Sequence, residues 1–149
     1  MNATLTSAQS TTAPLQWSDA LSLDMPLMDA THQEFVALLA EVVQAPDVLL
    51  VPRWGALIAH TQDHFDREDQ WMQDTGFAAD NCHATQHKVI LQVMREGEAR
   101  GHAGDVDVVR QMARELGAWF PQHAQSMDAS LALHLRSAGY DPTTGAIST

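Results

Sequence analysis

The sequence predicts an all-α protein, an antiparallel four-helix bundle with up-down-up-down topology and an N-terminal arm. Four stretches place apolar residues three or four positions apart, which is the spacing of one face of an α-helix. Short connections separate these stretches, and helices joined in this way pack antiparallel. No stretch reads convincingly as a strand. We expect a disordered arm over 1–16, the bundle over 17–140 and a flexible tail over 141–149.

The first two helices are predicted over residues 29–45 and 52–75. Each carries an apolar stripe at helical spacing, and in each the stripe includes histidine. Pro52 suits the first turn of the second helix, and Gly76 suits the position just after its end. The apolar residues 48–51 lie between two prolines, so we expect them to form a connection.

The third and fourth helices are predicted over residues 80–100 and 105–138. Glycines follow both of them and act as stop signals. Pro121 interrupts the fourth helix. Because a helical proline clashes with the carbonyl four residues earlier, we expect a kink over residues 117–121.

The composition excludes several classes of protein. The 149 residues carry 8 Lys and Arg against 19 Asp and Glu, a formal net charge of −11, which disfavours binding to nucleic acid or to an anionic membrane. No stretch approaches the ~20 apolar residues of a membrane-spanning helix. The first 15 residues lack the basic and apolar regions of a signal peptide, so we expect a cytoplasmic protein. Cys82 is the only cysteine, which excludes an intrachain disulfide.

Every predicted helix carries histidine or carboxylate side chains on its core-facing stripe. Residues four apart on a helix differ by only about 40° around its axis, so such pairs point the same way. The last pair is an exception, because its members are five apart and separated by about 140° on an ideal helix. The candidate metal ligands are His32 on the first helix, His64 and Glu68 on the second, His83 and His87 on the third, and His123 and Asp128 on the fourth.

This cluster indicates a metal centre. Burying an unpaired polar group costs roughly 1–3 kcal/mol, and seven of them would consume most of the ~5–15 kcal/mol that stabilises a domain. Seven ligands exceed the four of a tetrahedral zinc site, and they suffice for two metal ions with both carboxylates bridging. Imidazole combined with carboxylate suits iron, copper, nickel or zinc.

The four segments, in this order, resemble the hemerythrin family, in particular its single-domain bacterial members. The matching segments run from Leu23 to His32, from His64 to Asp69, from His83 to His87 and from Trp119 to Asp128, and the likeness covers residues 17–140. The resemblance implies a non-haem centre of two iron ions with a bridging oxo or hydroxo group, which binds O₂ reversibly. It further implies that His83, His87 and His123 hold one iron, that His32 and His64 hold the other, and that Glu68 and Asp128 bridge them.

Other residues are candidates for the surroundings of the site. Phe120 stands where the family usually has a leucine that lines the O₂ pocket, and Asp69 stands where it usually has a second glutamate. Trp119 and His60 are further pocket candidates, although packing or solvent contact explains His60 more simply. Cys82 adjoins a candidate ligand, but its side chain should point about 100° away from the ligand face.

The main interpretation is an O₂ carrier, store or delivery protein that is not an enzyme and that supplies an unidentified oxidase or oxygenase. The alternatives are an O₂ or redox sensor that acts through a signalling partner, a peroxidase-like or NO-handling di-iron enzyme, and an iron-buffering or zinc-filled structural site. Ferritin-like di-iron enzymes use a carboxylate-rich set with Glu-x-x-His motifs. The histidine-rich set therefore favours reversible binding over substrate oxidation.

Overall fold

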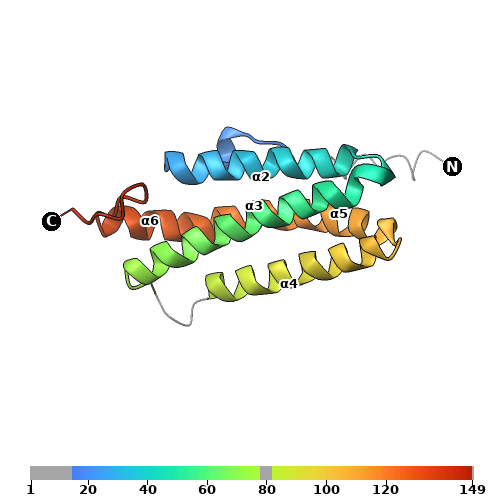
Figure 1. Ribbon diagram of the computed structural model, residues 1–149. Coiled ribbons are helices and arrows are strands. Elements are labelled where there is room, and N and C mark those ends of the chain that lie inside the picture. Colours follow the sequence, from blue (N-terminus) through green and yellow to red (C-terminus); the bar gives the residue numbers. More distant parts are fainter. Residues whose placement is uncertain (1–14, 78–81, 149) are drawn as a thin grey trace.

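A computed structural model describes residues 15–77 and 82–148, and over these residues its secondary structure is helical apart from one isolated bridge, which confirms the predicted all-α class. The long helices lie alongside one another in an elongated bundle, and α5, η2 and α6 continue one another as its last segment (Figure 1). The elements are a 3₁₀ turn η1 (Asp19–Leu21), α2 (Pro26–Gln44), α3 (Asp47–Asp74), α4 (Cys82–His102), α5 (Val106–His123), a π-helical turn η2 (Ala124–Asp128) and α6 (Ala129–Ser137).

Helices α2 and α3 begin earlier than the sequence predicts. Residues 48–51 are helical, so the expectation that they form a connection is wrong. Leu50 is completely buried, and its packing in the core favours one more helical turn before Pro52. A proline this close to the start removes a single intrahelical hydrogen bond, which the helix tolerates. Helix α2 begins with Pro26, a residue whose fixed φ suits the first position of a helix.

The irregularity in the last helical segment lies after Pro121 and not over residues 117–121. Helix α5 passes through Pro121 to His123, and the backbone then widens into the π-helical turn η2. There the N–H of Ala129 donates to the carbonyl of Ala124, five residues earlier. A π turn joins residues five apart, so His123 and Asp128 come to lie on the same side of the segment. The separation of about 140° expected from an ideal α-helix therefore does not hold here.

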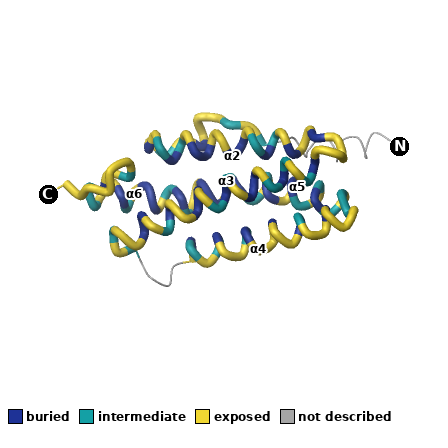
Figure 2. The backbone as a smooth tube through the Cα atoms, in the orientation of Figure 1, coloured by how far each residue is buried: buried dark blue, intermediate teal, exposed yellow. Residues whose placement is uncertain are grey.

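The interior consists of two apolar clusters separated by a polar layer. The Trp54 cluster includes Phe35 and Phe120, and the Trp71 cluster includes Met28 and Leu131. Along α2 the buried residues pass from the Trp71 cluster through His32 to the Trp54 cluster. Helix α3 and the last segment show the same division, whereas the buried residues of α4 begin at the polar layer with His83. The buried stretches lie toward the inside of the bundle (Figure 2).

The residues that follow α6 fold back on themselves and contact α3. After Gly139, whose positive φ of 67° ends α6, the chain folds back so that the N–H of Ser148 donates to the carbonyl of Gly139. The Tyr140 hydroxyl donates to Asp74 at 2.9 Å and ties this loop to α3.

Most of the predicted arm falls on residues 1–14, outside the described residues. Over the part that is described, no helix combines the length and apolarity needed to cross a lipid bilayer.

Candidate metal centre

The seven candidate ligands meet in the polar layer between the two apolar clusters. Each is buried, and none has more than 4% of its surface exposed. Their ligand atoms form two groups, within each of which all atoms lie within 4.8 Å of one another. One group comprises Glu68, His83, His87, His123 and Asp128, and the other comprises His32, His64, Glu68 and Asp128. The two carboxylates belong to both groups.

The two oxygens of Glu68 face different histidines. Oε2 lies 2.7 Å from Nε2 of His64 and 3.8 Å from Nε2 of His32. Oε1 lies 3.1 Å from Nε2 of His83 and 3.4 Å from Nε2 of His87. One carboxylate from α3 therefore connects the two-histidine group with the three-histidine group.

The two oxygens of Asp128 also face different histidine groups. Oδ2 lies 3.1 Å from Nε2 of His32. Oδ1 lies 2.8 Å from Nε2 of His83 and 3.2 Å from Nε2 of His123. All five imidazoles thus present Nε2 to the carboxylates, in groups of two and three.

Several of these atoms approach one another without forming hydrogen bonds. Nε2 of His32, His87 and His123 and both carboxylate oxygens of Asp128 are buried and have no hydrogen-bond partner among the described residues. Buried polar atoms rarely stay without a partner, and each costs free energy. Lone pairs of nitrogen and oxygen that converge in this way are the ligands of metal ions such as iron and zinc. The residues present therefore fit two metal ions.

The charges within the cluster shift one another's pKa. Burial lowers the pKa of His32, but the close approach of its ring to the Asp128 and Glu68 carboxylates outweighs burial and raises this pKa to about 9. The pKa of His83 is raised to about 9 for the same reasons. Burial raises the pKa of Glu68, yet the neighbouring imidazoles, His64 foremost, hold it well below its ordinary value. Without metal, protonated imidazoles thus supply the positive charge that the carboxylates require.

Two residues outside the cluster orient its imidazoles. Nδ1 of His87 lies 2.9 Å from the Asp69 carboxylate, and Nδ1 of His123 lies 2.8 Å from Oε1 of Gln86. Because both partners are acceptors, each Nδ1 carries the hydrogen and each Nε2 keeps its lone pair for the site.

Sequence reasoning missed the role of Gln86 and noted Asp69 only as a departure from the family pattern. The available signal was position alone, since each residue directly adjoins a candidate ligand in the sequence. The contact between Gln86 and His123 spans 37 positions, so no helical periodicity could have predicted it.

The pocket candidates lie in different surroundings. Phe120 is buried beside the two-histidine group, with its ring centre 5.2 Å from that of His32. Trp119 stacks on His123 of the three-histidine group at 4.4 Å. Nε2 of His60 lies 3.0 Å from the exposed Glu34 carboxylate, and its ring centre lies 6.4 Å from that of His64, so His60 lies between the bundle surface and the two-histidine group. Cys82 is exposed at the first residue of α4.

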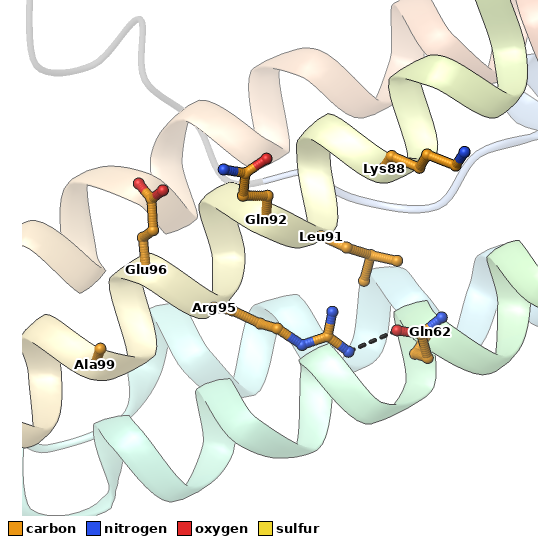
Figure 3. Close-up of a pocket in the computed structure, with 7 residues that line it drawn as sticks. All are labelled: Gln62, Lys88, Leu91, Gln92, Arg95, Glu96 and Ala99. Carbon is orange, nitrogen blue, oxygen red and sulfur yellow. Dashed lines mark hydrogen bonds between the residues drawn. The ribbon is translucent and has the colours of Figure 1, made fainter.

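A groove of about 570 Å³ lies on the outer surface between α3 and α4 (Figure 3). Arg95 spans it and donates to Gln62 on α3 at 2.5 Å, and Lys88 extends from the same helix as Arg95. No candidate ligand lines this groove. It is therefore separate from the metal cluster.

Comparisons with known proteins agree with this description. Residues 24–133, a span that includes all seven candidate ligands, match the sequence model of the hemerythrin HHE cation binding domain. The chain is 37% identical over 127 residues to a bacteriohemerythrin of Ralstonia nicotianae, covering 85% of this chain and 93% of that protein. Bacteriohemerythrins of Stenotrophomonas maltophilia and Pseudomonas paraeruginosa are 24% and 26% identical over 124 and 121 residues. No solved structure gives a significant match.

Proposed function

We propose that this chain, which belongs to the hemerythrin family, binds O₂ reversibly at a non-haem di-iron centre and carries, stores or delivers it without acting as an enzyme. The observation that supports this most strongly is the division of the two buried carboxylates, each of which faces both histidine groups. That arrangement suits two metal ions bridged by both carboxylates and does not resemble a four-ligand structural zinc site.

The two histidine groups differ in how many ligands they offer. In the proposal, His83, His87 and His123 would hold one iron, His32 and His64 would hold the other, and Glu68 and Asp128 would bridge both, together with an oxo or hydroxo group. Because this second group offers one histidine fewer, an iron held there would keep a position for O₂. Two iron ions supply the electrons that O₂ takes up on binding and returns on release.

The protein's own contribution is to exclude water and to hold the ligands. Phe120 packs against His32 and stacks on Phe35 with ring centres 4.6 Å apart, so apolar rings cover the two-histidine side. A dry site prevents the loss of reduced oxygen species and the irreversible oxidation of iron. On the other side, Gln86 and Trp119 fix the ring of His123.

The proposal also covers the architecture and cellular context of the chain. We propose the antiparallel up-down-up-down order, with the bundle over 17–140, and Figure 1 supports this order because each long helix begins near the end of the bundle where the previous one stops. We further propose a cytoplasmic protein whose ligand is O₂ and whose partner is an oxidase, an oxygenase or a signalling protein. The net charge of −11 argues against nucleic acid and anionic membranes as partners.

The test is to reduce the iron-loaded protein without air, admit O₂, and record its visible spectrum through repeated cycles of O₂ and argon. The proposal predicts charge-transfer bands that appear with O₂ and vanish under argon. An irreversible diferric spectrum after the first exposure, or no bands at all, contradicts reversible binding. Redox sensing, or chemistry with peroxide or NO, would then replace it.

A further inference from the structure

A second hollow, about 160 Å³ in volume, lies between α4 and α5, and we call it the α4–α5 cleft. Its deeper wall is formed by Trp54, Met94 and Leu116, all of them buried. Its rim includes Val93, which is 40% exposed, so that a small molecule can enter from solvent. Seven of its eight lining residues are apolar, and the remaining one is Glu115.

The polar atoms of the two lining tryptophans are already bonded elsewhere. The indole N–H of Trp54 donates to the carbonyl of Met94 at 2.9 Å, and that of Trp119 donates to Gln86 at 3.2 Å. A water molecule is held in a cavity only where it finds two to four polar partners, and this lining offers mainly the Glu115 carboxylate. The cleft therefore suits an apolar occupant better than water.

The size of the cleft limits what can occupy it. Cavities of about 150 Å³ with apolar walls bind benzene or xenon, whereas pockets for drug-sized ligands are typically ≈ 300–1,000 Å³. A peptide or a nucleotide cofactor is therefore too large. Glu115 at the rim and the net charge of −11 disfavour an anion.

Trp119 connects the cleft to the candidate metal centre. The same indole ring that lines the cleft stacks on the imidazole of His123, with ring centres 4.4 Å apart and planes 27° from parallel. The indole N–H of Trp119 and Nδ1 of His123 both form hydrogen bonds with Oε1 of Gln86. A molecule that packs against Trp119 thus restrains the two groups that position His123.

We propose that the α4–α5 cleft is a binding site for a small, uncharged, apolar molecule no larger than about benzene, and that its occupancy acts through Trp119 on the position of His123. Binding itself requires no O₂ and no redox change. A failure of the cleft to bind such a molecule is therefore distinguishable from a failure of the proposed O₂ function.

The binding test is calorimetric titration of the iron-loaded protein with benzene. We expect saturable binding of one molecule, and we expect Val93→Phe, which fills the rim, to weaken it by about tenfold or more. Val89→Phe is the matched control, because Val89 lies one turn earlier on α4, is 52% exposed and does not line the cleft. Benzoate, the anionic analogue, should bind about tenfold more weakly than benzene because of Glu115. Absence of saturable binding, equal effects of the two substitutions, or equal affinity for benzoate overturns the site.

The test of the connection to His123 is the rate at which a chelator removes iron. Benzene at saturation should slow this removal by about twofold or more in the unaltered protein, because a restrained His123 dissociates less readily. The Val93→Phe variant should show no change with benzene. Equal rates with and without benzene in the unaltered protein overturn the role of Trp119.

Discussion

Removing the metal should make the stability of the chain fall as the pH rises. In the metal-free protein the pKa of His32 and that of His83 are raised from the ordinary value of 6.5 to about 9. A group whose pKa is raised on folding contributes stability that is fully present below its unfolded pKa and is lost as the pH rises through its folded pKa. The shift of either imidazole corresponds to about 3 kcal/mol, and because both share the same carboxylates we expect about 3–5 kcal/mol in total.

The assay is urea unfolding of the chelator-treated protein at a series of pH values. We expect the free energy of unfolding to be highest near about pH 6 and to fall by about 3–5 kcal/mol toward about pH 10. Glu68 and Asp128, whose pKa values are lowered, stay ionised throughout this range and leave the slope unchanged. The iron-loaded protein is the control, since bound metal takes the place of the protons. A metal-free stability that is flat or rises between about pH 6.5 and 9 would refute the reasoning.

Three substitutions test the assigned roles. Asp128→Asn should lower the iron bound per chain from two to one or fewer, measured by metal analysis, whereas Glu34→Gln at the exposed surface should leave it unchanged; equal iron contents would argue against a bridging carboxylate. Gln86→Ala should weaken metal binding by about ten- to a hundredfold in a chelator competition, because it removes an acceptor that orients a ligand. Gln92→Ala, on the exposed side of the same helix, is its control, and similar losses in both variants would contradict the orienting role. Phe120→Ala should destabilise the protein by about 3–5 kcal/mol in urea unfolding and hasten irreversible oxidation under O₂, since it opens a space beside the two-histidine group. An oxidation rate equal to that of the parent protein would rule out Phe120 as a barrier to water.

The parts of the site that follow α-helical geometry could be predicted from the sequence. His64 with Glu68, and His83 with His87, are four residues apart, and α3 and α4 are regular helices over these positions. The two side chains of each pair therefore point to the same side of their helix, as the α-helical periodicity predicts. The resemblance to the hemerythrin family also indicated that the four ligand-bearing segments belong to one site, because they follow one another in the family's order.

The parts that depend on irregular backbone or on contacts between helices could not be predicted in the same way. Pro121 signals an irregularity, but the irregularity lies beyond it, in the π-helical turn that brings His123 and Asp128 together. The early start of α3 depends on the burial of Leu50, which is a property of the packed bundle. Gln86 acquires its role only when α4 lies against α5, because its partner is on that neighbouring helix.

The most direct test of the central claim is a crystal structure of the iron-loaded protein with anomalous data collected at the iron edge. The account predicts two iron peaks, one in contact with His83, His87 and His123 and the other with His32 and His64. Glu68 and Asp128 should each contact both ions. A single peak, or a second ion that lies outside the reach of the two carboxylates, would contradict the account.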